Sequence, residues 1–462
     1  MHEEVRGRSG REQQPKTAGM HKRAALSGFF GSTLEYYDFS IYASAAALVF
    51  PGIFFPSGNA TVALVASLAT YAVGYVARPI GAFVLGNWGD RHGRKNVLVF
   101  ALLLMGFSTF AVGLLPTFGQ VGILAPILLV ALRLIQGFAV AGELSGASAL
   151  IAEHAPADRR GFFTSFSLQG TQAGSILASA AFIPLSAMLP TEAFHSWGWR
   201  VPFLLSAFVV VAGYLIRRRV AETPAFLEEA EQQVVPKAPV VRVLRESGWT
   251  VFRAILMGLA NVIGTTAAVF GTAYATQPAY GIGMSPATYL WMPVMANIVA
   301  VILIPFFGRL SDRIGRRPLM IFGSLSAGVL SFAYLWAISQ KNVVLTVVLA
   351  ILMWGVLYQM WNATFASFFQ ELFPTRTRVT GFAISQNLGL LIVAFLPTVF
   401  TLIAPPGSTN VPLVIGGLTF VLSAASAIAT WMTRETSKLS LDALDAAERS
   451  AVREPSARAK AV

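Results

Sequence analysis

The sequence predicts an all-α membrane protein in which twelve spanning helices form two pseudo-symmetric six-helix bundles. Three observations lead to this fold class. Of the 462 residues, 55% are hydrophobic and only 12% are charged, about half the charged fraction of a soluble protein. The apolar residues are gathered into twelve runs, each long enough to cross a bilayer. A charged loop motif occurs twice, once in each half of the chain.

A spanning helix is expected where about 20 mostly apolar residues follow one another, the length that crosses about 30 Å of hydrocarbon. Several of the runs contain proline, which membrane helices tolerate because neighbouring groups satisfy the freed backbone groups. The short alternating segments of a membrane β-barrel are not seen in the sequence. The expected spans are residues 26–54, 61–86, 97–115, 123–152, 161–189, 200–216, 251–278, 287–308, 318–338, 342–370, 379–403 and 411–432.

Three polar and charged segments divide the chain into its expected domains. Residues 1–25 and 433–462 are expected to be solvated tails, and residues 217–250 a linker. The two six-helix bundles then comprise residues 26–216 and 251–432. The first segment has no short apolar core followed by a small-residue cleavage site, so we do not expect it to be a removed signal peptide.

The basic residues predict the orientation of the chain. Of its 34 lysines and arginines, 30 lie in the tails, the linker and the loops on one side of the expected membrane, and only Arg200 and Lys341 lie on the other side. By the positive-inside rule, both termini and the linker are cytoplasmic, in a multi-pass protein of the inner or plasma membrane. The net charge of +12 therefore reflects topology, and no nucleic-acid partner is expected.

The loop motif reveals an internal repeat. Residues 86–95 after the second span read GNWGDRHGRK, and residues 308–317 after the eighth span read GRLSDRIGRR. A second set recurs after the fourth and tenth spans, where Glu153, Pro156 and Arg160 match Glu371, Pro374 and Arg378. Two six-helix halves in parallel orientation explain both pairs. Such repeats are typical of transporters, whose substrate site lies near mid-membrane between the repeats.

The doubled loop motif resembles the signature of the major facilitator superfamily, over nearly all of residues 26–432. Within it, the chain resembles the metabolite:proton symporter family, and the runs at 125–130 and 196–200 resemble its shikimate-transporter-like members. The further motifs are Glu35-Tyr36-Tyr37-Asp38-Phe39, Arg78-Pro79, Arg133-x-x-Gln136-Gly137 to Gly142-Glu143, Trp199-Arg200-Val201-Pro202-Phe203, and Glu371-Leu372-Phe373-Pro374-Thr375 to Gly381. The resemblance implies the major facilitator fold, a conformational gate, and proton coupling through the acidic residue of the first span and the arginine of the fourth.

The repeated loops carry charges that can hold helix ends together. Glycines allow a tight turn between spans, and a carboxylate opposite an arginine forms charge-assisted hydrogen bonds. We expect two cytoplasmic clusters that latch the halves when the inward side is shut. Their residues are Asp90, Arg94 and Glu153 in the first half and Asp312, Arg316 and Glu371 in the second. The alternative is that these arginines only set topology, although topology needs no acidic partners at matched offsets.

Five ionisable residues fall inside spans, all of them in the first half: Glu35, Asp38, Arg78, Arg133 and Glu143. Each would cost several kcal/mol if it faced lipid, so they should face the interior and pair with one another. Glu35, Arg78 and Glu143 lie at similar depths and could form one cluster. Asp38 and Arg133 are the second candidate pair.

A membrane-embedded carboxylate beside an arginine can act as a proton switch, because a conformational change that separates the two changes which protonation state is favoured. In this hypothesis, outside protons neutralise Asp38 and free Arg133 to hold the carboxylate of an anionic substrate. The alternative is a static buried ion pair that specifies helix packing.

Polar side chains at membrane depth predict the rest of the substrate site, because an unpaired amide in hydrocarbon is costly. The candidates besides Arg133 are Gln136, Gln169, Gln172, Asn261, Trp354 and Asn387. For a single aromatic residue such as Trp354, packing is the plainer role. The spacings Gly142-x-x-x-Gly146 and Gly170-x-x-x-Gly174 predict close helix contacts.

The sequence therefore favours secondary active import of a small organic acid, shikimate-like, aromatic, or di- or tricarboxylic, by proton symport with alternating access. The alternatives are a proline- or betaine-type zwitterion importer, a proton-driven exporter, and a membrane sensor. We expect no enzyme activity and no cofactor beyond the proton gradient, since the chain has no nucleotide loop, no cysteine and only five histidines. The expected partners are the small-molecule substrate, protons and the lipid bilayer, with a monomer as the functional unit.

Overall fold

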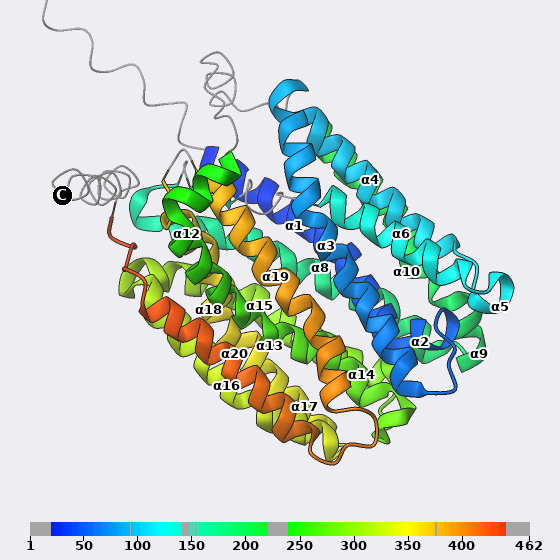
Figure 1. Ribbon diagram of the computed structural model, residues 1–462. Helices are drawn as coiled ribbons and strands as arrows, with labels where there is room; N and C mark the ends of the chain where they lie inside the picture. Colours follow the sequence, from blue (N-terminus) through cyan, green and yellow to red (C-terminus); the bar gives the residue numbers. More distant parts are fainter. Residues whose placement is uncertain are drawn as a thin grey trace, which may run out of the picture.

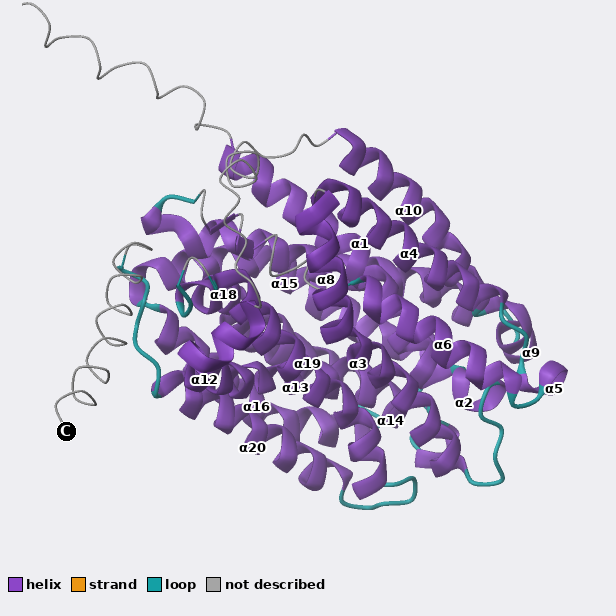
Figure 2. Ribbon diagram, turned by 45° about the horizontal axis from the view of Figure 1, so that its top comes forward, coloured by secondary structure: helices purple, strands orange, loops and turns teal. Residues whose placement is uncertain are grey.

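In a computed structural model of the chain, the structure describes residues 20–92, 94–140, 148–149, 151–152, 155–219, 239–374 and 377–439. Every regular element within these ranges is a helix (Figure 2). The first helix, α1 (Met20–Leu48), begins at the same end of the bundle at which the last, α20 (Val411–Trp431), finishes (Figure 1). We call this the terminal end, and the other the opposite end.

Six of the spanning helices come from the N-terminal half. After α1 they are α3 (Ala60–His92), α4 (Arg94–Leu114), α6 (Leu124–Ala139), α8 (Arg160–Met188) and α10 (Arg200–Arg219). Shorter elements form the connections at the opposite end, namely α2 (Phe50–Ile53), α5 (Phe118–Val121), α9 (Thr191–Ala193) and η2 (Phe194–Gly198). The short η1 (Ala157–Arg159) leads into α8 at the terminal end.

The C-terminal half supplies the other six spans, two of which change their helical geometry on the way through. The seventh consists of α12 (Pro239–Gly258), η3 (Leu259–Asn261), α13 (Val262–Thr265), η4 (Thr266–Phe270) and α14 (Gly271–Thr276), and η5 (Pro278–Tyr280) follows it. The tenth consists of α17 (Val343–Ala350), η6 (Ile351–Leu357) and α18 (Tyr358–Glu371). The remaining spans are α15 (Pro286–Ile314), α16 (Arg316–Ser339), α19 (Arg378–Ile403) and α20.

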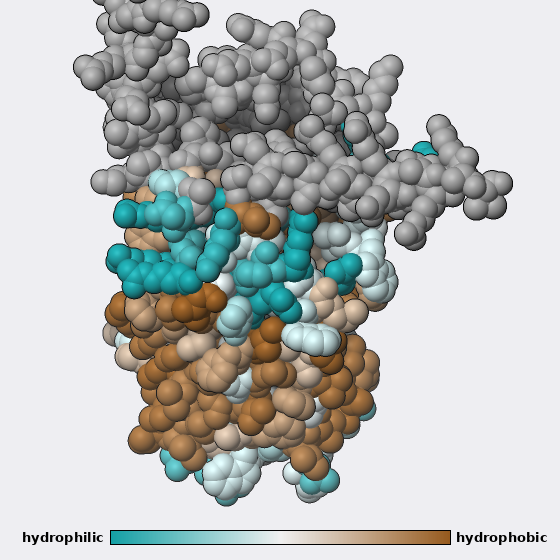
Figure 3. Space-filling view, turned by 90° about the vertical axis from the view of Figure 1, so that its left-hand side faces the viewer, coloured by the Kyte–Doolittle hydropathy of each residue, from teal (hydrophilic) through white to brown (hydrophobic). Residues whose placement is uncertain are grey.

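These helices confirm the all-α membrane fold. By length and composition, 8 helical segments of the described chain could cross a membrane, and two shorter apolar helices are Val99–Leu114 and Leu124–Ala139. Together with α1 and α10 they make up the twelve expected spans. On the face seen in Figure 3, a broad apolar belt lies between hydrophilic surfaces at the two ends. A lipid bilayer would cover such a belt.

The seventh span begins earlier than the sequence predicts. Residues 239–250, expected to belong to the linker, are helical and form part of α12, which bends at Ser247. Within this segment Val243 is fully buried in the core of the second half, whereas Arg242 and Glu246 pair at the surface with 2.9 Å between Nε and Oε1. The charged residues interrupt the apolar ones, so a search for long apolar runs misses this amphipathic stretch.

Two glycines bring α8 against α1, as their spacing predicts. A Cβ atom at Gly170 would overlap the carbonyl oxygen of Phe29, and one at Gly174 would overlap that of Thr33. The residues of the other predicted spacing, Gly142 and Gly146, lie outside the described residues. The same helix α8 also packs along α15 of the second half, and α3 packs along α19, so the two halves meet through these helix pairs.

A segment after the last helix remains at the terminal end and binds the start of α16. The carboxylate of Glu435 accepts hydrogen bonds from the backbone N–H groups of Arg316 and Arg317, at 2.9 and 3.0 Å. Burial alone would raise the pKa of Glu435, but these donors and the N–H of Ser437 outweigh it and hold the pKa below its ordinary value. The carboxylate therefore stays ionised at the N-terminus of α16, where a negative charge is stabilising.

We predict that Gly170→Ala destabilises the protein, because the added methyl group meets the backbone of α1, which cannot move aside as a side chain can. Overpacking of this kind costs about 1–3 kcal/mol. Thermal unfolding of the detergent-purified protein measures the effect. The matched control is Gly52→Ala in α2, where a Cβ atom has no heavy atom within 4 Å. Equal unfolding temperatures for the two variants would contradict the proposed contact.

Candidate functional site

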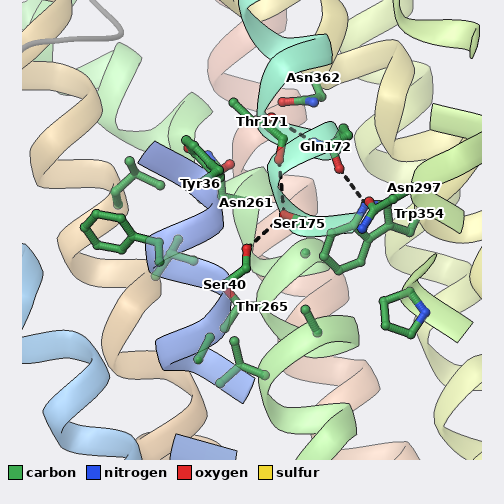
Figure 4. A pocket seen from close by; sticks show the side chains of 18 of the residues that line it. Tyr36, Ser40, Thr171, Gln172, Ser175, Asn261, Thr265, Asn297, Trp354 and Asn362 are labelled. Carbon is green, nitrogen blue, oxygen red and sulfur yellow. Dashed lines mark hydrogen bonds between the residues drawn. The ribbon is translucent and has the colours of Figure 1, made fainter. Parts of the chain in front are cut away.

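A cavity of about 150 Å³ lies between the two halves (Figure 4). Its walls come from α1, α3 and α8 of the first half and from the seventh, eighth, tenth and eleventh spans of the second. The seventh and tenth spans contain π-helical segments here, η4 and η6, and such irregular turns are common at functional sites. The polar and aromatic lining includes Tyr36, Ser40, Tyr71, Tyr75, Thr171, Gln172, Ser175, Asn261, Thr265, Asn297, Trp354, Tyr358, Asn362 and Gln386.

The lining is polar but uncharged. None of the described residues around the cavity is acidic, basic or a histidine. Tyr358 donates from its hydroxyl to Asn261 Oδ1 at 2.9 Å, within the second half. Trp354 donates from Nε1 to Gln172 Oε1 at 3.3 Å, and this bond crosses from one half to the other. A molecule in the cavity would therefore meet hydroxyl groups, amides and aromatic rings.

Contacts between the halves lie on both sides of the cavity. Toward the terminal end, Gln169 donates from Nε2 to the carbonyl oxygen of Val301 at 2.8 Å, joining α8 to α15. Toward the opposite end, Gln277 donates to the carbonyl oxygen of Ala47 at 2.5 Å. Val269 also packs in one apolar cluster with Ala47 and other residues of the first half. The cavity therefore lies between two sets of contacts that join the halves.

The predicted substrate residues fall into two groups. Those that line the cavity are Gln172, Asn261 and Trp354. Gln169 instead makes the contact between α8 and α15 described above, and Asn387 is buried outside the lining while its neighbour Gln386 lines the cavity. Whether Gln386 or Asn387 faces the cavity depends on how the helix is rotated about its axis, and hydropathy does not reveal that rotation.

Arg133 and Gln136 lie behind the cavity wall. The guanidinium carbon of Arg133 is 4.5 Å from the ring centre of Phe39 and 4.1 Å from that of Tyr42, close enough for cation–π attraction. Its Nη2 donates to the carbonyl oxygen of Tyr71 at 3.2 Å. Because Phe39 and Tyr71 line the cavity and Arg133 does not, these two rings separate the guanidinium from the cavity.

Asp38 and Arg133 are connected through two other side chains. Arg133 Nη1 donates to Gln136 Oε1 at 2.5 Å, and Gln136 Nε2 donates to Thr109 Oγ1 at 2.8 Å. Thr109 Oγ1 then lies 3.0 Å from Asp38 Oδ2, to which it donates. The structure shows no ion pair between Asp38 and Arg133 among the described residues, which corrects the expected direct contact. The amide of Gln136, one turn along α6, occupies the place next to the guanidinium.

Glu35 and Arg78, in contrast, form a buried ion pair. Their Oε1 and Nη2 atoms are 3.6 Å apart, and the guanidinium carbon of Arg78 lies 4.3 Å from the ring centre of Phe39. The ring of Phe39 therefore contacts both buried arginines of the first half. The third residue expected in this cluster, Glu143, lies outside the described residues.

A network of ion pairs joins the halves at the terminal end. Arg316 binds Asp312 with 2.7 Å between Nη1 and Oδ1, and binds Glu371 with 3.1 Å between Nη2 and Oε1. Arg160 at the start of α8 approaches the same Oε1 of Glu371 to 2.9 Å. Asp312 accepts hydrogen bonds from the backbone N–H groups of Gly161 and Phe162 at 2.8 and 2.9 Å. Three side chains predicted from the repeat therefore lie together against the first half.

The matching cluster of the first half cannot be described in the same way. The side chains of Asp90 and Arg94, and all of Glu153, lie outside the described residues. The helices that carry the first two are described: α3 extends to His92, and α4 begins at Arg94.

Several residues of these sites were not among the predicted ones. Arg160 could have been found from the repeat, since Arg378 stands at the matching position of the second half. Thr109 and Asn297 carried no signal, because one hydroxyl or amide in an apolar helix is common and its direction depends on packing. No three His, Cys, Asp or Glu side chains come together as a metal site in the part of the chain that the structure describes.

The fold and the central cavity between its halves are those of a transporter with two six-helix halves, and comparison with known proteins identifies the family. The pattern described as Major Facilitator Superfamily matches residues 28–397. The chain belongs to this superfamily of membrane transporters, and it is accordingly a transport protein and not an enzyme.

Similar proteins include bacterial metabolite transporters. An inner membrane metabolite transport protein of Escherichia coli strain K12 is 37% identical over 437 residues, covering 93% of this chain and 98% of that protein. A shikimate transporter of the same organism is 32% identical, covering 80% of this chain and 85% of the transporter. A proline/betaine transporter of Salmonella typhimurium is 31% identical, covering 82% of this chain and 77% of that transporter.

Solved structures resemble the fold. A proton:xylose symporter of the same superfamily, bound to a bromodeoxyglucose, superimposes with a TM-score of 0.70 at 17% sequence identity. The match covers 93% of this chain and 99% of the symporter. An inward-open structure of the xylose transporter from E. coli gives a TM-score of 0.67 at 19% identity. These similarities show the fold.

We predict that Glu371→Gln opens the terminal end, because the neutral amide leaves Arg160 and Arg316 buried without their shared counter-charge, at a cost of about 3–5 kcal/mol. The chain has no cysteine, so Ser165→Cys is a clean reporter. Ser165 is fully buried against Gly308 between the halves. Maleimide labelling of this cysteine should accelerate by about tenfold or more in Glu371→Gln.

The control for this labelling experiment is Glu246→Gln in the same Ser165→Cys background. Glu246 is also a glutamate paired with an arginine, but that pair is exposed and lies within α12. Its removal should leave the labelling rate unchanged. If Glu371→Gln labels no faster than this control, the ion-pair network does not hold the halves together.

Proposed function

We propose that the protein imports a small organic acid together with protons, by alternating access of the central cavity. The observation that carries the proposal is a series of hydrogen bonds that links Asp38 through Thr109 and Gln136 to Arg133. This hydrogen-bond series lies directly behind the cavity wall. The chain shares its superfamily with the proton:xylose symporter, and its relatives include a shikimate transporter. We therefore favour a shikimate-like, aromatic, or di- or tricarboxylic substrate.

The volume of the cavity supports a small substrate. A cavity of about 150 Å³ in another protein binds a single benzene ring. The hydroxyl and amide groups around it can bind the hydroxyl and carboxyl groups of a metabolite, and Trp354 offers an aromatic face and an N–H donor. Lining groups come from both halves, so a bound molecule would contact both of the bodies that move in alternating access.

The hydroxyl of Thr109 gives this hydrogen-bond series two possible arrangements. Its single hydrogen can go to Asp38 Oδ2 or to the carbonyl oxygen of Met105, each at 3.0 Å. In our proposal the hydroxyl donates to Asp38 while that carboxylate is ionised. Protonation of Asp38 removes its charge and lets the Thr109 hydroxyl turn to Met105. The hydrogen bonds that fix Gln136 and Arg133 are then weaker. The freed guanidinium then attracts the carboxylate of the substrate past Tyr71.

The gate and the topology complete the proposal. We assign the helices α1 to α10 and α12 to α20 to the two moving bundles, with the ion-pair network of Asp312, Arg316 and Glu371 closing the cytoplasmic side. The count of basic residues supports placing the terminal end in the cytoplasm. One relative is named as an inner membrane protein, and we propose the same location for this chain.

A zwitterion importer is the second candidate. The aromatic lining and the absence of charge among the described lining residues suit a quaternary ammonium group, which aromatic rings attract. Relatives named as proline/betaine transporters add to this case. No observation favours an exporter or a sensor.

Uptake into proteoliposomes with an imposed pH gradient tests the function. The panel contains shikimate, a dicarboxylate, proline and glycine betaine. We expect uphill uptake of an organic acid when the outside is acidic, and its collapse when a protonophore is added. Uptake of the zwitterions alone would favour the second candidate, and uptake that ignores the pH gradient would contradict proton symport.

We predict that Asp38→Asn abolishes uphill accumulation while the protein still exchanges substrate across the membrane. The amide of the variant accepts the hydrogen bond from Thr109 but cannot be ionised or protonated in the working pH range. The hydrogen-bond series therefore no longer responds to proton binding. One proton per substrate drives about tenfold accumulation per pH unit, and this factor should fall to about one. Asp158→Asn, at an exposed aspartate paired with Arg159, is the control and should accumulate normally. Normal accumulation by Asp38→Asn would rule out the switch.

A further inference from the structure

Asn297 is the one amide among the described residues of the cavity lining that has a buried side-chain atom without a hydrogen-bond partner. It lies on α15, lines the cavity, and is 1% exposed. Its Oδ1 atom is buried, and no group in the described part of the chain donates a hydrogen bond to it. The neighbouring amides have partners: Gln172 accepts from Trp354, Asn261 accepts from Tyr358, and Asn362 donates to Gln359 at 2.8 Å.

An unpaired buried oxygen calls for a physical reason. Most buried polar side-chain atoms in folded proteins have a partner, and those that lack one weaken the fold. A valine or leucine would fill the same place in α15 without that penalty. The amide is explained if its partner is a molecule that enters the cavity.

The surroundings place this amide at the meeting point of the two halves. Next to it, the carbonyl oxygen of Ala296 would lie 2.7 Å from a Cβ atom added at Gly355, so α15 and η6 are in close contact here. Trp354 of η6 reaches across to Gln172 of the first half through a hydrogen bond of 3.3 Å (Figure 4). A ligand that touches Asn297 therefore lies beside the one described hydrogen bond of the cavity that joins the halves.

We propose that Asn297 is a substrate-specificity residue whose Oδ1 accepts a hydrogen bond from a hydroxyl or N–H group of the transported molecule. An amide can turn by half a revolution and exchange its oxygen for its NH₂ group, but in either orientation the oxygen needs a donor. The substrate therefore carries at least one hydroxyl or N–H donor. The inference rests on the central cavity being the transport site of the proposed function.

The proposal separates two kinds of candidate substrate. Shikimate carries hydroxyl groups and proline carries an N–H group, whereas glycine betaine is fully N-methylated and has no donor. A site built to bind a donor rejects an analogue that lacks it, because the protein oxygen is then left unpaired. We expect selection against glycine betaine at this position, whatever the carboxylate contributes elsewhere.

Binding to the detergent-purified protein tests the proposal, with shikimate, proline and glycine betaine as probes and thermal stabilisation as the readout. In Asn297→Leu, which keeps the size of the side chain and removes both polar atoms, the Kd of the donor-bearing probe that binds the wild type should rise about tenfold, the loss of one hydrogen bond. The Kd of glycine betaine should change less than about twofold. Without a probe, the variant should unfold at the same or a higher temperature.

The control variant is Thr398→Val. The buried hydroxyl of Thr398 also lacks a partner among the described residues, but it is not part of the cavity lining. Its removal should leave every Kd unchanged. An Asn297→Leu protein that binds all probes as the wild type does, or that loses affinity for all three equally, would overturn the proposal.

Proton movement separates this proposal from the proposed function. If the wild type binds shikimate or proline but takes up no protons with them, proton symport fails, and the comparison of Asn297→Leu with Thr398→Val still decides the role of the amide. If uptake is proton-driven and the selectivity of Asn297→Leu equals that of the wild type, symport stands and the specificity role fails.

Discussion

The carboxylate of Glu371 is the group on which the closed terminal end depends. It is buried between Arg160 of one half and Arg316 of the other, so neither arginine is left with an unpaired charge. A buried charge without its partner is strongly destabilising, and these side chains therefore stabilise one another only as a set. Because Asp312 is bound to Arg316 and also accepts from the backbone at the start of α8, the same set fixes α8 against α15.

The buried charged side chains of the spans are separate from the residues that line the central cavity. The described charges buried within the spans of the first half, Glu35, Asp38, Arg78 and Arg133, are not part of the cavity lining, and the described lining itself is neutral. A neutral lining binds a substrate without paying to desolvate a fixed ion. The ring of Phe39 contacts both guanidinium groups and also lines the cavity, so it links these buried charges to the space where a ligand would lie.

Hydropathy and charge were enough to predict the spans, because span length and loop charge follow from the bilayer, and the repeated loop motif was needed to predict the two six-helix halves. The repeat also predicted that Asp312, Arg316 and Glu371 lie together, since matched offsets place them at matched helix ends. The link between Asp38 and Arg133 through Thr109 and Gln136 was out of reach, because it depends on how α1, α4 and α6 are rotated about their own axes. Asn297 was missed for the same reason, and residues 239–250 because charged residues interrupt the apolar ones of this helix.

The residues after α20 bear on how the protein is made. Thr436 donates to Glu371 at 2.5 Å, and Arg160 donates to the carbonyl oxygen of Leu439 at 2.6 Å, so the network includes a segment that follows the last span. Chains are synthesised from the N-terminus, and early domains fold before late ones. Arg160, Arg316 and Glu371 are thus synthesised before their partners Thr436 and Leu439. The network at this end can therefore acquire all of its contacts only after the residues that follow α20 have been synthesised.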